Sequence, residues 1–172
     1  MARLAWAALA AAIVGSITTV LALDTVTTQR TSSLPKGIYV RTFEEPVVGS
    51  IVKFDAPPVF MEKMQESIEH ATPDNKAGLQ WWYDWFSTWP NGFMKHVAAR
   101  AGDHVCVNDE GYFVRGERVG GTVEPGKWRG CRTLGSGEMA VVGEGESIDT
   151  RVFGPIPEHR VRTYRLLYRF QG

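Results

Sequence analysis

The sequence predicts a mainly β, antiparallel domain that carries a helical insertion and follows one N-terminal transmembrane helix. Short β-branched runs bounded by Gly or Pro occur before residue 55 and again after residue 92. Segments with helical periodicity lie between these two groups, over residues 59–90. An uncharged segment opens the chain. We therefore expect a transmembrane signal-anchor over residues 1–23 and an exported, mainly β domain over residues 24–172.

The composition excludes several classes of protein. The 172 residues suffice for one globular domain, and 19 Lys and Arg balance 19 Asp and Glu. A neutral balance argues against binding of nucleic acid through bulk charge. Two Cys and four His exclude a zinc-finger array and a disulfide-rich scaffold. We expect no metal and no other cofactor, and nothing in the sequence indicates an oligomeric state.

The uncharged opening segment, Leu4–Leu23, is long enough to cross a bilayer. As a helix its 20 residues extend ~30 Å, which matches the hydrocarbon core. A cleaved signal peptide is the main alternative, but its apolar region spans only ~7–15 residues and ends at a small-x-small site. A buried core helix is a third reading. Arg3 before the segment and Asp24 after it place the amino terminus in the cytoplasm and the remaining chain outside.

The first half of the exported part combines two strands with a helix. Asp24–Thr31 reads as a polar stalk, and Gly37–Thr42 and Ser50–Phe54 read as strands bounded by Gly or Pro. In Val59–Ala71 apolar residues recur every four positions, which predicts an amphipathic helix. Further strands are expected at Phe93–Ala99, His104–Val107, Tyr112–Arg115, Met139–Val142 and Arg162–Tyr168.

An aromatic helical face is expected in the second part of the insertion. At ~100° per residue the five large aromatic side chains fall within an arc of ~140°. They are Trp81, Trp82, Trp85, Phe86 and Trp89. Such a face can pack in the core, contact the membrane surface or occupy a groove of a partner. Membrane contact is the specific reading that we prefer.

Lys95 is the most informative polar residue. In a strand over Phe93–Ala99, the lysine shares one face with Phe93, Val97 and Ala99. Burial on this apolar face lowers the pKa of an amine and makes it a candidate general base near neutral pH. The alternative is a lysine whose amine extends past its neighbours into solvent.

Two polar segments could supply partners for a neutral amine. Hydroxyl groups crowd the segment Thr31–Gly37, where Pro35 and Gly37 constrain a turn. In the second segment, Ser147, Asp149 and Arg151 alternate, so an extended backbone would direct all three to one face. Ordinary solvated turns are the alternative for both.

The two cysteines, Cys106 and Cys131, are expected to form a disulfide if the chain is exported. The bridge would close a loop of about 25 residues and contribute ~3 kcal/mol. Two unpaired buried thiols are the alternative.

Three segments together resemble the motif blocks of type I signal peptidases. They are Ser33-Leu-Pro-Lys-Gly-Ile-Tyr39, Lys95-His-Val-Ala-Ala-Arg-Ala-Gly-Asp103 and Ser147-Ile-Asp149-Thr-Arg151-Val-Phe-Gly-Pro155. The first block reads S-x-P-x-G-x-Y, which is similar to the TraF-type peptidases of conjugal transfer systems. The resemblance covers residues 30–54 and 93–172, and the helical insertion lies outside it. His96, Thr150 and Val152 depart from common family residues, but none of these changes removes a catalytic group.

The resemblance implies a signal-peptidase-like antiparallel β domain and assigns roles residue by residue. Ser33 is the implied nucleophile and Lys95 its general base, a Ser–Lys variant of triad chemistry. The Ser33 backbone N–H and the Thr31 hydroxyl are the implied oxyanion donors. Ser147 is implied to orient the lysine, and Asp149 and Arg151 to form an ion pair beneath the site. A disulfide between the positions of Cys106 and Cys131 is also familiar in this branch. Ser32 would be the nucleophile only if the first block followed the S-x-x-P spacing.

The implied function is that of a membrane-anchored serine endopeptidase that processes exported proteins, with a pilin-type substrate in conjugal transfer. The implied partners are an exported preprotein or propilin and the lipid bilayer of a bacterial inner membrane, with the catalytic domain on the periplasmic side. Ser33 lies only ten positions after Leu23, at most ~35 Å of extended chain. Alternatives are a general type I signal peptidase and a non-catalytic, membrane-tethered assembly factor. An acyl-enzyme could also be attacked by an amine instead of water.

Overall fold

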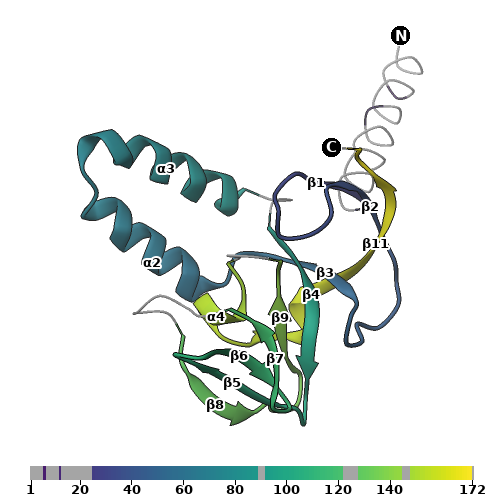
Figure 1. Ribbon diagram of the computed structural model, residues 1–172. Helices are drawn as coiled ribbons and strands as arrows, with labels where there is room; N and C mark the ends of the chain where they lie inside the picture. The colour runs from purple at the N-terminus through teal and green to yellow at the C-terminus, as the bar shows by residue number, and fades with distance from the viewer. Residues whose placement is uncertain are drawn as a thin grey trace.

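Two antiparallel sheets form the body of the protein, and a helical hairpin projects from it (Figure 1). In this computed structural model the described residues are Trp6, Ala12, 25–88, 92–121, 128–144 and 148–171. The larger sheet has seven strands in the order β1-β2-β11-β3-β4-β9-β10, and the smaller has four in the order β7-β6-β5-β8. The predicted mainly β, antiparallel fold is therefore confirmed.

The larger sheet brings distant parts of the chain side by side. Its strands are β1 (Val26–Gln29), β2 (Gly37–Arg41), β3 (Ile51–Phe54), β4 (Phe93–Arg100), β9 (Glu138–Val142), β10 (Ile156–Pro157) and β11 (Val161–Arg169). Strand β4 lies between β3 and β9, with Val52 opposite Lys95 and Val142 opposite His96. The lysine strand is therefore paired on both edges.

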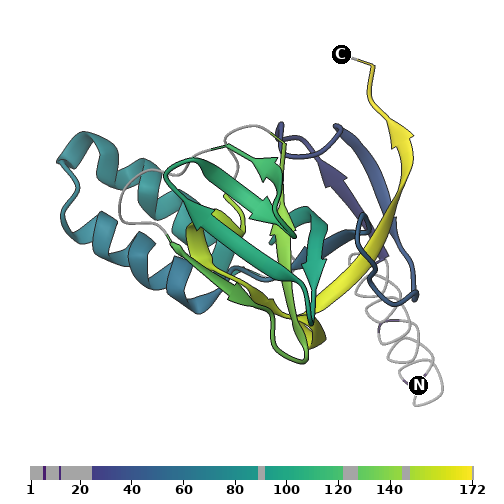
Figure 2. The same ribbon diagram turned by 60° about the horizontal axis from the view of Figure 1, so that its bottom comes forward.

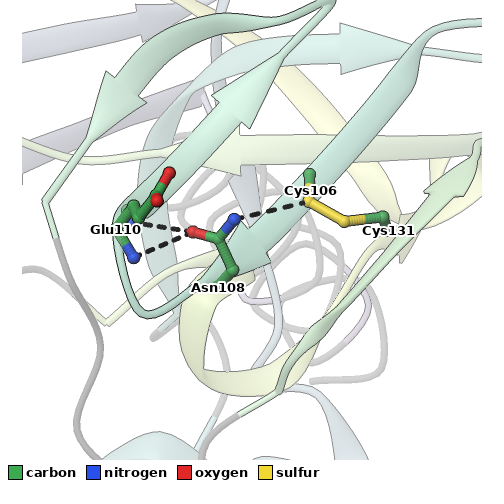
Figure 3. The surroundings of a disulfide bond; sticks show 5 residues. Cys106, Asn108, Glu110 and Cys131 are labelled. Carbon is green, nitrogen blue, oxygen red and sulfur yellow. Dashed lines mark hydrogen bonds between the residues drawn. A yellow bond between two sulfur atoms is a disulfide. The ribbon is translucent and has the colours of Figure 1, made fainter.

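The smaller sheet lies across the larger one in Figure 2 and carries the disulfide. It contains β5 (His104–Asn108), β6 (Gly111–Val114), β7 (Glu117–Gly120) and β8 (Gly130–Thr133). Cys106 of β5 and Cys131 of β8 occupy opposite positions in the register and are joined, as Figure 3 shows. The expected disulfide is confirmed.

Two helices connect β3 to β4. Helix α2 (Pro58–Glu69) and helix α3 (Pro73–Ser87) each begin with a proline in the first turn, where its missing N–H costs nothing. They run antiparallel as a hairpin beside the sheet body (Figure 1). Helix α2 buries Phe60 and Ile68, whereas none of the residues of α3 is buried. Helix α3 is therefore attached to the body by only part of its surface.

Three apolar clusters hold these elements together. The first joins β3, β4, β9 and the hairpin through Phe54, Phe60 and Phe93. The second fills the space between the two sheets, and the third surrounds Leu34 and Tyr39 next to β4. The third cluster is the one that positions the candidate site.

Two local predictions were wrong. Asp24–Thr31 is not wholly a polar stalk, because Val26–Gln29 pairs with β2 as strand β1. The extended backbone considered for the third block does not continue beyond Asp149 either, since Thr150–Phe153 forms the short helix α4 with Asp149 as its N-cap. The predicted anchor at Leu4–Leu23 lies outside the described residues apart from Trp6 and Ala12. Within the described part of the chain, no helix has both the length and the apolar character needed to cross a membrane.

Candidate active site

The first motif block folds as a turn that is held from both sides. The Leu34 side chain is 1% exposed and packs with Tyr39, while the Tyr39 hydroxyl donates to the Pro35 carbonyl at 2.6 Å. A Cβ at Gly37 would lie 2.3 Å from the Tyr168 carbonyl oxygen, so only glycine allows β2 to approach β11 here. The spacing of this block thus fixes Ser33 on a rigid support.

Strand β4 carries the second block against this turn. Its burial alternates as predicted, with Lys95, Val97 and Ala99 buried and His96 half-buried. Met94 is also buried and belongs to the same apolar cluster as Leu34. Residues adjacent in sequence to Ser33 and to Lys95 therefore pack together. Gly92 precedes the strand, where a Cβ would lie 2.4 Å from the Phe54 carbonyl oxygen.

Ser33 has a defined polar environment. Its side chain is buried, and its Oγ accepts a hydrogen bond from the Gln29 amide at 3.2 Å. The Thr31 Oγ1 lies 3.1 Å from the Ser33 Oγ and also accepts from the Gln29 amide. Ser32, in contrast, is exposed. These contacts favour Ser33 as the reactive hydroxyl.

Gln29 is a site residue that sequence reasoning missed. It ends strand β1 and is 8% exposed, the only buried residue of that strand. The β-branched run Val26-Thr27-Thr28 was the available signal for a strand. The contact between Gln29 and Ser33 depends on the turn that follows and has no signature of its own.

The Lys95 amine lies in an apolar environment. The residue is 3% exposed, and Nζ lies 5.9 Å from the centroid of the Phe93 ring. Loss of hydration disfavours the charged form and lowers the pKa of Lys95 to about 8, although Asp149 opposes this effect. A substantial neutral fraction near neutral pH is what a general base requires.

The third block forms a buried ion pair within a helical turn. Asp149 and Arg151 are 0% and 4% exposed, and Asp149 Oδ2 accepts from Arg151 Nη2 at 2.7 Å. Asp149 Oδ1 also accepts from the Arg151 backbone N–H, and Oδ2 from that of Gly143. The predicted pairing is present, but a helix N-cap brings it about rather than a strand.

The loop after β9 links this ion pair to the turn that carries Ser33. The Gly143 N–H donates to Asp149 at 3.0 Å, and the N–H of the next residue, Glu144, donates to the Ser33 carbonyl at 3.0 Å. Two adjacent amides therefore connect the first and third blocks. Backbone bonds of this kind support a fixed geometry around the Ser33 hydroxyl.

A cavity of about 410 Å³ brings the two candidate catalytic residues to one surface. Ser33 and Lys95 both line it, and the other polar lining residues are Gln29, Thr31, Ser32 and Glu144. Strand β1, the turn after it, the start of β4 and the loop after β9 thus converge on one space. A polypeptide entering the cavity would meet a buried hydroxyl and a desolvated amine.

The other predicted site residues are distributed differently. Ser147 and Trp89 lie outside the described residues. Cys106 and Cys131 belong to the smaller sheet and do not line the cavity. Among the described residues, no group of three or more His, Cys, Asp or Glu could hold a metal ion. Trp82, Trp85 and Phe86 line the cavity, whereas Trp81 does not.

Comparison with known families covers almost the whole chain. A family model described as signal peptidase, peptidase S26, matches residues 1–165. No curated protein matches the chain. The matched range includes the turn at Ser33, strand β4 and the buried ion pair.

Proposed function

The chain belongs to the signal peptidase family, peptidase S26, and we propose that it is a membrane-anchored serine endopeptidase that cleaves exported proteins. In this proposal Ser33 is the nucleophile and Lys95 is the general base. The observation that carries it is the shared cavity, in which a buried serine hydroxyl and a lysine with a pKa of about 8 line the same space.

The reaction follows from the protonation state of Lys95. The neutral amine accepts the Ser33 proton while Oγ attacks the scissile carbonyl carbon. The negative charge that develops on the carbonyl oxygen is stabilised by the Ser33 N–H and the Thr31 hydroxyl, whose oxygen lies 3.1 Å from Ser33 Oγ. As the intermediate collapses, the carbon–nitrogen bond breaks and the Lys95 ammonium returns the proton to the leaving amine.

The resulting acyl-enzyme is an ester of Ser33. Neutral Lys95 then accepts a proton from water while the water oxygen attacks the ester carbon. When the carbon–oxygen bond to Ser33 breaks, the Lys95 ammonium returns this proton to the serine oxygen, and the acid product ionises to a carboxylate. An amine of a substrate could take the place of water and form a new amide bond instead. Both outcomes use the same two residues.

The Asp149–Arg151 pair has a supporting role in this proposal. Both side chains are almost completely buried, so each needs the other to compensate for lost hydration. The negative charge of Asp149 raises the pKa of Lys95, and the positive charge of Arg151 lowers it. Burial, which also lowers this pKa, is the largest of the three effects. Ser147 remains a proposed orienting partner of Lys95.

The substrate class rests on the first motif block. S-x-P-x-G-x-Y, as in Ser33–Tyr39, is similar to the TraF-type branch. We therefore propose an exported propilin of a conjugation apparatus as substrate, and an inner-membrane location with the catalytic domain in the periplasm. A general type I signal peptidase that acts on secretory preproteins is the alternative.

Substitution at the two candidate residues tests this function. The full chain would be expressed in bacterial membranes together with an exported propilin or preprotein, and maturation would be followed by mass spectrometry. We expect Ser33→Ala and Lys95→Ala to abolish maturation, whereas Ser32→Ala, the adjacent exposed serine, retains it. Maturation that persists in the Ser33→Ala and Lys95→Ala variants would contradict the proposal and favour a non-catalytic assembly factor.

A further inference from the structure

One wall of the cavity is contributed by the helical hairpin and is strongly apolar. Met64 of α2 and Leu79, Trp82, Trp85 and Phe86 of α3 line the same space as Ser33 and Lys95. The polar lining comes from β1, the turn at Ser33, β4 and the loop after β9. The hairpin supplies most of the apolar lining, to which Phe93, Met94 and Ile148 also contribute. The insertion therefore takes part in forming the candidate active site.

Phe86 attaches the apolar wall to the strand that carries Lys95. Its ring stacks on Phe93 with centroids 4.6 Å apart and meets the Phe60 ring edge-on at 5.5 Å. Phe93 lies two residues before Lys95 on β4. These contacts fix helix α3 relative to the candidate base.

Trp82 is held in place by Phe86 but is not itself buried. The two rings stack with centroids 5.9 Å apart, and Trp82 remains 44% exposed. Trp85 contacts both, with its ring 6.0 Å from that of Trp82 and 4.9 Å from that of Phe86. Phe86 packs against the core, but none of the residues of α3 is buried, so core packing does not explain the exposed ring of Trp82.

We propose that Trp82 and Trp85 form a subsite that binds a bulky apolar side chain of the substrate polypeptide close to the cleaved bond. The proposal rests on the proposed function, because it takes the cavity as the place of cleavage. Continuity between the aromatic wall and the Ser33–Lys95 surface identifies the occupant as substrate rather than an unrelated partner.

The size and chemistry of the space support a bulky apolar residue. The cavity volume of about 410 Å³ falls within the usual range for ligand sites, which are predominantly apolar with a few polar groups. An alanine side chain in front of this wall would leave most of the indole surface in contact with water. A leucine or phenylalanine side chain would bury that surface, and removal of apolar surface from water favours binding.

Occupation of this subsite would also favour catalysis. An apolar side chain seated on Trp82 and Trp85 removes water from the space that Lys95 shares, and loss of water disfavours the ammonium form. The subsite thus couples recognition of the substrate to the state of the base.

Cleavage of a peptide library tests the subsite. The full chain in detergent micelles would be incubated with peptides from a digested bacterial proteome, and the new termini would be sequenced by mass spectrometry. We expect large apolar residues to be enriched at one position near the cleaved bond. Two synthetic peptides that differ only by Leu or Ala at that position would then be compared by kcat/KM.

Variants of helix α3 provide the matched comparison. The wild-type enzyme should prefer the Leu peptide by about tenfold or more, as expected for an apolar pocket. We expect Trp82→Ala and Trp85→Ala to reduce this preference to near one, and Trp82→Phe to retain most of it. Trp81→Ala is the control, because Trp81 is 58% exposed on the same helix but does not line the cavity.

An unchanged preference in both Trp82→Ala and Trp85→Ala would overturn the subsite. If these variants and Trp81→Ala instead lose binding to vesicles of phosphatidylcholine and phosphatidylglycerol while the preference is unchanged, the aromatic face is a membrane contact and the subsite is refuted. A failure of the proposed function looks different. In that case the wild-type chain shows no cleavage that depends on Ser33, and both proposals fall together.

Discussion

Replacement of Lys95 by methionine is expected to stabilise the fold while it abolishes cleavage. Burial lowers the pKa of Lys95 from the ordinary value of 10.5 to about 8. At pH 7 the amine is mostly charged in both states, so the folded state carries the cost of desolvation. At about 1.4 kcal/mol per pH unit, this cost is about 3 kcal/mol. Methionine fills a similar apolar space without a charge.

The stabilisation expected from Lys95→Met depends on pH. Between pH 8 and 10.5 the unfolded chain binds more protons at this position than the folded chain does. The stability of the wild-type protein therefore rises with pH through this window. The advantage of Lys95→Met should be complete below pH 8 and should fall to less than about 0.5 kcal/mol at pH 10.5.

Chemical and thermal unfolding of the full chain in detergent micelles, followed by tryptophan fluorescence, measures this effect. About 3 kcal/mol corresponds to a rise in Tm of roughly 10 °C for a domain of this size. Lys76→Met, at an exposed lysine of α3, should leave stability unchanged. No gain for Lys95→Met at pH 7, or a gain that persists at pH 10.5, would refute the desolvation argument.

Four further outcomes are expected. Because the pKa of Lys95 is about 8, kcat/KM should rise roughly fivefold from pH 7 to 8 and level off above pH 9, and a flat profile from pH 6 to 9 would argue against this base. Thr31→Ala should lower kcat by about 10²–10³ with little change in KM, whereas Thr31→Ser should retain activity. Asp149→Ala should lower the free energy of unfolding by about 3–5 kcal/mol, because it leaves the Arg151 charge buried without its partner. In urea unfolding, the double variant that lacks both side chains should regain part of this stability. Replacement of both cysteines by serine should cost about 3 kcal/mol, because the disulfide closes a loop with a separation of 25 residues; an unchanged urea midpoint would contradict this.

The elements that the sequence predicts well are those with a strong local period. Alternation along Phe93–Arg100 identifies both the strand and the buried face of Lys95, because side chains in a strand alternate strictly. Prolines and the four-residue spacing identify helix α2. Strand β1 lacks this signal, since it is short and polar, and its pairing with β2 follows from the turn at Ser33.

Contacts between distant segments explain what the sequence does not predict in the site. The hydrogen bond from Glu144 to the Ser33 carbonyl joins backbone groups and leaves no trace in residue type. The alternation of Ser147, Asp149 and Arg151 suggests a strand, but Asp149 is a favourable N-cap and the backbone turns instead. Helical periodicity finds the aromatic face of α3 but does not reveal that part of this face borders a cavity.

The position of strand β1 links the predicted anchor to the candidate site. If Leu4–Leu23 spans the bilayer, only Asp24 and Thr25 separate it from Val26, so β1 begins within ~11 Å of the membrane segment. Strand β1 ends at Gln29, which donates a hydrogen bond to Ser33. A single short strand would then hold the nucleophile close to the lipid surface, where an exported substrate emerges from its own membrane segment. Insertion of a flexible Gly-Ser linker between Asp24 and Thr25 should therefore leave cleavage of a soluble peptide intact but slow the cleavage of a membrane-inserted preprotein. If the linker leaves the rate of preprotein cleavage unchanged as well, this account is contradicted.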